Sequence, residues 1–149
     1  MVIRWVIAAV HLLALGIGLG SVWARSRALR RAPDEGAIRF ALEADVAWGI
    51  AALLWVSTGV ARAFGGLEKG TTYYLINYAF WAKMALFVVI VVIEFTMAPT
   101  FGRWRAGLRR GEGIDTSRAG TFATLSTLQA ALVVAMVFAA TAMARGFGN

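Results

Sequence analysis

Cysteine is absent from this chain of 149 residues, histidine occurs once and proline only twice. Without cysteine there are no disulfides, thiolate metal sites, iron–sulfur clusters or covalently attached c-type haem. A single histidine also excludes a bis-histidine haem within one chain. Charged residues are scarce, at 15% of the chain, whereas 60% of the residues are hydrophobic. A water-soluble domain of this size cannot bury so much apolar surface, so the composition predicts an integral membrane protein.

Long apolar segments make up most of the chain. A helix needs about 20 apolar residues to cross roughly 30 Å of hydrocarbon, and four segments are long enough. None shows the alternation of a β-barrel strand. The four segments are Trp5 to Ala24, Val46 to Phe64, Leu75 to Phe101 and Ala119 to Ala144. The sequence therefore predicts an all-α integral membrane four-helix bundle, a single transmembrane domain over residues 1–149, with helices at about 4–26, 36–64, 73–101 and 116–145.

Basic residues are divided unequally between the two sides of this bundle. Ten arginines lie in the connections between the first and second and between the third and fourth helices: Arg25, Arg27, Arg30, Arg31, Arg39, Arg103, Arg105, Arg109, Arg110 and Arg118. The positive-inside rule places both connections in the cytoplasm and both termini on the outer side of the membrane. Topology and anionic lipid explain the net charge of +7, so no nucleic-acid partner is expected.

Turn and capping residues mark the expected helix boundaries. Residues 33–36 combine a proline break with a helix start, and residues 115–117 supply polar side chains that can cap the fourth helix. Glycines in residues 65–70 indicate a short outer turn between the second and third helices. Pro99 is expected to bend or end the third helix.

His11 is the only histidine, and it lies inside the first apolar segment. An ionisable side chain at that depth is costly without a partner, which makes it a candidate functional residue. Ala14 and Gly18 share its helical face and leave space for a flat group or a close neighbour. Gly16 and Gly20 form a small-xxx-small motif for close helix packing. His11 is therefore either a structural residue that hydrogen-bonds across the bundle or a cofactor ligand.

Lys83 and Glu94 are the charged residues within the third apolar segment. Because the first and third helices run in the same direction, Lys83 and His11 are expected at similar depths in the outer half. Lys83 either pairs with a propionate, a quinone oxygen, a carbonyl or an acid, or snorkels outwards. Glu94 lies about 16 Å further along the helix. It either pairs with Arg103 or an arginine of the first connection, or belongs to a proton path.

Other polar and aromatic residues complete the set of candidates. Trp55 and Trp81 are expected near the depth of His11, either as walls of a cofactor pocket or as core packing. Interhelical hydrogen bonds are expected from Ser126, Thr127 and Gln129 of the fourth helix. With one histidine, a haem iron has to be five-coordinate, to take a second ligand such as methionine or lysine, or to be shared across an oligomer. The methionines considered are Met84, Met97, Met136 and Met143, whose alternative role is to fill gaps in the core.

Three stretches of the chain carry a family resemblance: Val6 to Arg25, Phe64 to Tyr74 and Phe80 to Met84. Together they resemble a family of small bacterial four-helix membrane proteins of unknown function. The resemblance implies a bacterial inner membrane, with both termini on the periplasmic side. More distantly, a histidine in the first helix and a lysine in the third are similar to the haem-binding membrane protoporphyrinogen oxidase and to the copper-resistance membrane proteins. In that oxidase the histidine is associated with haem binding. The resemblance carries this role over to His11, with Lys83 as its companion.

Two functional hypotheses follow from these residues. The first is a multi-pass inner-membrane redox protein that binds haem b or a related tetrapyrrole through His11 and Lys83, with His11 as a metal ligand only to the haem iron. The alternative is a non-catalytic accessory or assembly subunit of a larger membrane complex. A transporter of this length needs a homo-oligomer to build a path. No hydrolase motif, phosphate-binding glycine loop or metal-spaced histidine pair occurs.

Overall fold

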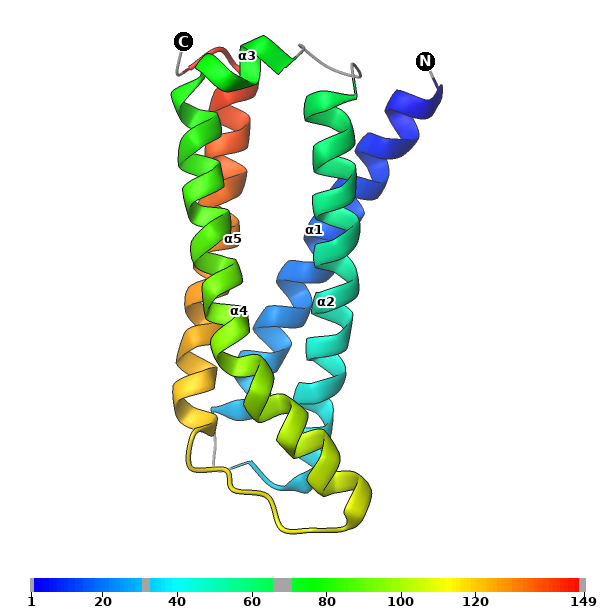
Figure 1. The fold of residues 1–149 in the computed structure, drawn as a ribbon, viewed down its shortest axis with the longest axis vertical. Helices are drawn as coiled ribbons and strands as arrows, with labels where there is room; N and C mark the ends of the chain where they lie inside the picture. Colours follow the sequence, from blue (N-terminus) through cyan, green and yellow to red (C-terminus); the bar gives the residue numbers. More distant parts are fainter. Residues whose placement is uncertain (1, 31–32, 66–70, 148–149) are drawn as a thin grey trace.

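The computed structural model describes residues 2–30, 33–65 and 71–147, and all its elements are helices. They are α1 (Val2–Leu29), α2 (Glu35–Phe64), α3 (Thr71–Ile76), α4 (Tyr78–Arg110) and α5 (Ala119–Ala144) (Figure 1). All except α3 are long and apolar enough to cross a membrane, which confirms the predicted all-α architecture of four apolar helices. Arg31 and residues 66–70 of the glycine turn predicted at 65–70 lie outside the described residues.

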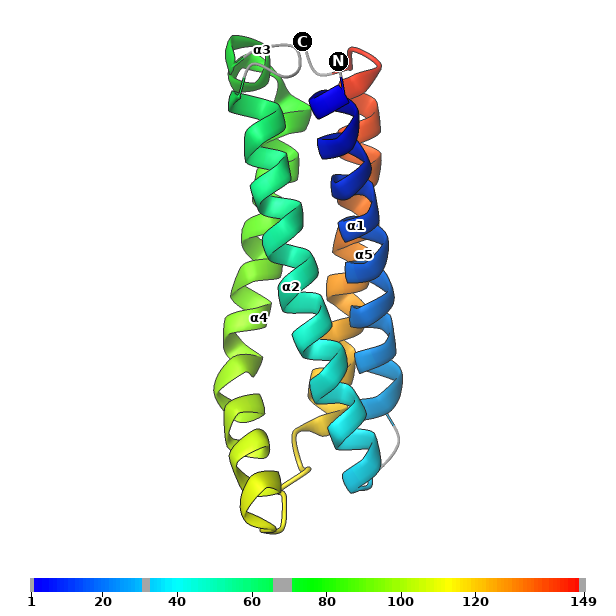
Figure 2. The same cartoon turned by 90° about the vertical axis from the view of Figure 1, so that its right-hand side faces the viewer.

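The four long helices alternate in direction, so that α1 begins and α5 ends at the same end of the molecule (Figure 1). We call this the terminal end and the opposite one the arginine-rich end. Helix α1 packs along α2 and α5, and α5 also packs along α4 (Figure 2). Helices α2 and α4 meet towards the arginine-rich end, where Trp48 and Asp45 of α2 bond to Glu94 and Arg105 of α4. In the terminal half the ribbons of these two helices lie apart (Figure 1).

The arginine-rich end is closed by an aromatic core. Phe101, Trp104 and Phe122 are all buried, with ring centroids 5.5–5.8 Å apart. Because burial of these rings favours continued helix, α4 extends to Arg110 rather than ending at Phe101 as predicted. Pro99 lies inside this helix and does not end it. Since proline cannot donate the helical hydrogen bond, the helix changes direction in its lower half (Figure 1).

The start of α5 differs from the prediction, whereas that of α2 agrees with it. Asp34 caps α2 by accepting a hydrogen bond from a main-chain amide of the first turn, at 2.7 Å. Asp115, in contrast, accepts from the amide of Ser117 at 2.9 Å, which lowers the pKa of its carboxyl. Because the Asp115 carboxylate is engaged in this local turn, it does not cap α5 as predicted. Helix α5 consequently begins at Ala119, after Arg118, whose side chain makes no capping hydrogen bond.

A buried asparagine separates α3 from α4, where the sequence predicted one continuous helix from residue 73. The Asn77 Oδ1 atom accepts from the main-chain amides of Ala79 and Phe80 in the first turn of α4, at 2.9 and 3.3 Å. Its Nδ2 atom donates to the carbonyl of Phe147, at 3.1 Å. The Tyr73 hydroxyl donates to the carbonyl of Met143, at 2.7 Å. These bonds tie α3 to the end of α5 across the terminal end.

Replacing Asn77 by alanine is expected to lower the free energy of unfolding by about 1–2 kcal/mol, because the cap of α4 and the bond to Phe147 are lost together. Urea titration of the detergent-solubilised protein, followed by tryptophan fluorescence, measures this. Thr72→Ala is the control, since Thr72 is exposed in the neighbouring helix, and is expected to change stability by less than about 0.5 kcal/mol. Equal effects of the two substitutions would contradict the capping role.

Candidate functional site

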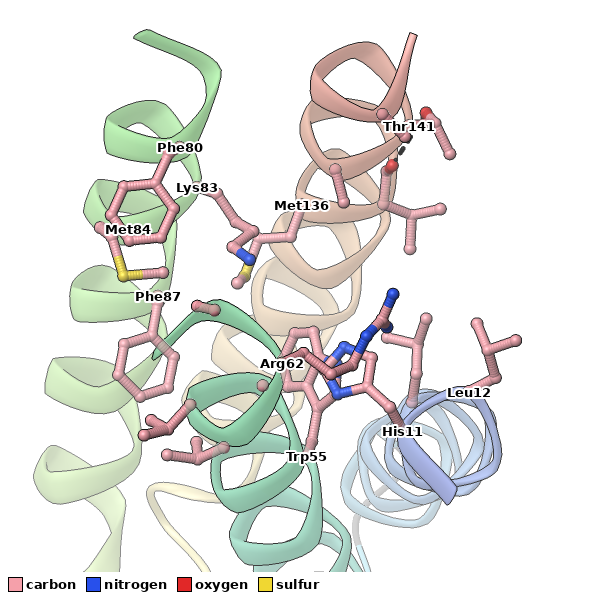
Figure 3. Close-up of a pocket in the computed structure, with 18 of the residues that line it drawn as sticks. His11, Leu12, Trp55, Arg62, Phe80, Lys83, Met84, Phe87, Met136 and Thr141 are labelled. Atoms are coloured by element: carbon pink, nitrogen blue, oxygen red, sulfur yellow. Dashed lines mark hydrogen bonds between the residues drawn. The ribbon is translucent and has the colours of Figure 1, made fainter. Parts of the chain in front are cut away.

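A cavity of about 320 Å³ opens in the terminal half of the bundle and is lined by all four long helices. We call it the terminal cavity. Its walls are largely apolar and include Leu15, Phe87 and Met136. A second cavity of the same volume adjoins it towards α3, and the two share lining residues. Figure 3 shows side chains from α1 and α2 on one side of this space and side chains from α4 on the other.

His11 contributes a ring nitrogen to this site. Its Nδ1 atom lies 2.9 Å from the hydroxyl oxygen of Thr58. That hydroxyl donates its single proton to the main-chain carbonyl of Leu54, at 2.6 Å. The Thr58 oxygen therefore accepts, and the Nδ1–H group of His11 is the donor. In the neutral imidazole the lone pair is then on Nε2, which makes no hydrogen bond within the described part of the chain.

Trp55 forms the wall beside His11, and the two ring centroids are 6.0 Å apart. Its indole Nε1–H group is buried and has no hydrogen-bond partner in the described structure. Such a buried donor is rare in a folded protein. Trp81, the other proposed wall, is exposed and donates to the carbonyl of Leu75 at 2.9 Å. Trp55 alone of the two tryptophans lines the terminal cavity.

Lys83 extends from α4 into the same cavity (Figure 3). Its ammonium group lies 5.7 Å from the centre of the Phe80 ring and makes no hydrogen bond or ion pair among the described residues. Arg62 of α2 also lines the cavity. The structure thus brings His11 and Lys83 together in one cavity, with a further cation beside them.

The methionines considered from the sequence lie in different parts of the bundle. Met84 of α4 and Met136 of α5 line the terminal cavity together with His11. Met97 is fully buried in the core of the arginine-rich end. Met143 packs near the terminal end and lines the adjoining cavity. Sulfur donors on two elements are therefore present in the cavity that contains the histidine.

Glu94 lies in a different place, within a polar cluster towards the arginine-rich end. Its carboxylate accepts from Arg25 at 3.1 and 3.2 Å, from Trp48 at 3.0 Å and from Gln129 at 3.0 Å. Arg103, the other predicted partner, bonds instead to the Thr100 hydroxyl. The expected pairing of Glu94 with an arginine from the first connection is observed, and the partner is Arg25.

Arg25 is the centre of this cluster, which we call the Arg25 cluster. Its side chain is fully buried and all five of its N–H groups have acceptors. The acceptors belong to α2, α4 and α5: they are Asp45, Glu94, Ser126 and Gln129. Arg105 donates to the second oxygen of Asp45, at 2.5 Å. Two guanidinium groups thus balance two carboxylates, and one side chain of α1 joins all four long helices.

The glycines that bring α1 close to α2 are not the predicted pair. A Cβ atom on Gly16 or Gly20 would meet no atom within 4 Å. A Cβ on Gly18 would lie 3.0 Å from the Trp48 ring and 3.5 Å from Ala51. The small-xxx-small motif therefore faces away from the other described helices, and Gly18 makes the close contact.

The chain matches one family of known proteins, the predicted membrane proteins designated DUF2214, over residues 3–148. It belongs to the DUF2214 family. With four helices of sufficient length, this DUF2214 protein is a polytopic membrane protein in contact with the lipid bilayer. No curated protein and no solved structure is significantly similar to the chain. The terminal cavity and the Arg25 cluster are therefore the two features of the molecule that bear on its activity.

The main polar centre of this DUF2214 protein was not found as a site from sequence. Arg25 was counted among the arginines of a connection, whereas it lies within α1 and is buried. One signal was present: Arg25 continues the three-to-four-residue spacing of Ala14, Gly18 and Val22, the buried face of α1. Asp45, one turn before Trp48 in α2, was likewise taken for part of an amphipathic extension.

Proposed function

We propose that this protein binds haem b in the terminal cavity, in a redox role, with the Nε2 atom of His11 as the iron ligand. The observation that carries the proposal is the orientation of that ring. Thr58 accepts from Nδ1–H, so that the lone pair of Nε2 remains for a metal. Histidine ligands of metals are commonly oriented in this way by a hydrogen bond from the other ring nitrogen.

The other residues of the cavity suit an amphipathic tetrapyrrole. Apolar side chains provide most of the wall, as is usual for ligand sites, and 320 Å³ lies at the lower end of the range of such sites. The adjoining cavity provides further room. Met84 and Met136 also line the cavity, and either would supply a thioether sulfur as a second ligand to the iron. Bound haem supplies one-electron chemistry, whereas the protein supplies the ligand, the apolar surroundings and the cations.

The proposal includes an orientation in the membrane. Exposed arginines gather at the arginine-rich end: Arg27, Arg30, Arg39, Arg103, Arg109, Arg110 and Arg118. The positive-inside rule favours this end in the cytoplasm of a bacterial cell, with the termini and the terminal cavity towards the periplasm. A reporter fused to the C-terminus, such as alkaline phosphatase, is expected to be active outside the inner membrane.

Absorbance spectra of the detergent-purified protein test the haem proposal. Protein from haem-replete cells is expected to show a Soret band that shifts on reduction and is lost in His11→Ala. Thr58→Val is expected to weaken haem binding about tenfold or more, since loss of a second-shell partner typically costs 10–100-fold in metal affinity. Ser57→Ala is the matched control, because the Ser57 hydroxyl bonds only to the Leu53 carbonyl and does not line the cavity.

Two results would contradict the proposal. One is a colourless preparation from haem-replete cells, which would favour the accessory-subunit hypothesis. The other is a Soret band that persists unchanged in His11→Ala, which would place the haem elsewhere. Circular dichroism of each variant shows whether the helices are retained.

A further inference from the structure

Lys83 places an ammonium group in an apolar cavity that contains no counter-ion among the described residues. No aspartate or glutamate is among the described residues that line the terminal cavity or the adjoining one. The ammonium group lies over the Phe80 ring, 5.7 Å from its centre. Charge in surroundings of low polarity is costly unless an opposite charge lies nearby. The cavity is therefore electrostatically suited to a ligand that carries a negative charge.

Trp55 supplies a second unpaired donor on the opposite side of the cavity. Its Nε1–H group is buried and has no partner among the described residues. In contrast, the indole of Trp48, two turns earlier in α2, donates to Glu94. A buried N–H group is normally paired, so the unpaired one in a cavity marks a place for an acceptor atom. Carboxylate oxygens accept from both ammonium and indole donors.

The exposed lining residues indicate where the ligand comes from. Leu12 of α1 and Val56 and Val60 of α2 line the terminal cavity and are themselves exposed. Both helices are long and apolar enough to cross a membrane, so these apolar side chains face lipid. Such an apolar rim suits a ligand dissolved in the bilayer rather than in water.

We propose that the terminal cavity recognises a carboxylate of an amphiphilic ligand, with Lys83 as the counter-ion and the Trp55 indole as a second donor. The inference rests on the proposed function to the extent that haem b, through its propionates, is the first ligand considered. The same chemistry is present in a fatty acid. Lys83 is a binding residue in this proposal, and His11 provides the metal ligand when the amphiphile is haem.

The first arm of the test compares haem b with its dimethyl ester, which blocks both carboxylates and leaves the iron unchanged. Titration of the haem-free protein in a nonionic detergent, followed at the Soret band, measures the two dissociation constants. The ester is expected to bind at least tenfold more weakly than the acid. In Lys83→Met the two are expected to bind equally, whereas Lys83→Arg retains the preference. Arg103→Met, which removes an exposed charge at the other end, is expected to behave as the wild type.

The second arm needs no haem. Stearic acid with a nitroxide label is added to the protein in nonionic detergent, and quenching of tryptophan fluorescence is compared with that by the labelled methyl ester. The acid is expected to quench at lower concentration than the ester, and this difference is expected to disappear in Lys83→Met and in Trp55→Phe. Circular dichroism and gel filtration of each variant show that its fold is retained.

The two arms distinguish failure of the inference from failure of the proposed function. Equal binding of acid and ester by the wild type in both arms would overturn the carboxylate proposal, even where His11→Ala abolishes haem binding. A Lys83-dependent preference for the fatty acid, with no haem binding at all, would support the carboxylate site and refute the haem function. A preference that persists in Lys83→Met would also overturn the assignment of Lys83.

Discussion

Arg25→Met is expected to lower the free energy of unfolding by about 3–5 kcal/mol, the usual cost of removing one partner from a buried ion pair. Methionine fills a similar volume but removes all five donors of the guanidinium group. Asp45 would retain Arg105 as a cationic partner. Glu94 would be left with neutral donors alone, inside the bundle. Unfolding by sodium dodecyl sulfate in mixed micelles, followed by tryptophan fluorescence, gives the free energy.

Matched variants separate the role of the Arg25 cluster from a general effect of charge. Arg27→Met removes the same charge from an exposed position on α1 and is expected to change stability by less than about 0.5 kcal/mol. The stability of Arg25→Lys is expected to be intermediate, because one ammonium group cannot reproduce the five N–H donors of the planar guanidinium group. Adding Glu94→Leu to Arg25→Met is expected to recover part of the loss, since the stranded carboxylate is removed. Wild-type stability of Arg25→Met would show that the cluster does not hold the helices together.

Gly18→Leu is expected to destabilise the bundle by about 1–3 kcal/mol through overpacking between α1 and α2. The Cβ atom alone would lie 3.0 Å from the Trp48 ring. That ring is buried and its indole N–H donates to Glu94, so it cannot turn away without breaking a hydrogen bond. Leucine has a higher helix propensity than glycine, by about 1 kcal/mol, and this gain is smaller than most of the expected loss from overpacking.

Gly16→Leu provides the control for this substitution on the same helix. A Cβ atom at Gly16 would meet nothing within 4 Å, so the leucine side chain is expected to point into lipid and to leave stability unchanged or raise it by up to about 1 kcal/mol. Sodium dodecyl sulfate titrations of both variants measure the difference. A larger loss at Gly16 than at Gly18 would favour the helix contact expected from the small-xxx-small motif.

Helix direction and residue spacing were sufficient to predict that His11 and Lys83 lie at similar depth. Both side chains line the terminal cavity, although they are 72 positions apart in the chain. The prediction succeeded because depth along a spanning helix follows from its length and direction. The hydrogen bond that orients the His11 ring could not be foreseen, since it depends on Thr58 of another helix.

Arg25 shows why the rest of the site escaped prediction. Its acceptors lie 20 positions away at Asp45, 69 at Glu94 and 104 at Gln129. An arginine beside other arginines at the end of an apolar segment has the appearance of a topological signal. Burial of that arginine became favourable only because three other helices bring acceptors to all its N–H groups.

The sequence by itself determined the four apolar helices and the clustering of arginine near two of their connections. These are properties of separate segments, because each helix must satisfy its own backbone and match the hydrocarbon thickness before it meets another. Tertiary structure alone decided that Gly18 rather than Gly16 meets α2, that Arg25 is buried, and that α2 and α4 separate beside His11. Such outcomes depend on how each helix is rotated and tilted against its neighbours, and hydropathy carries no information on that rotation.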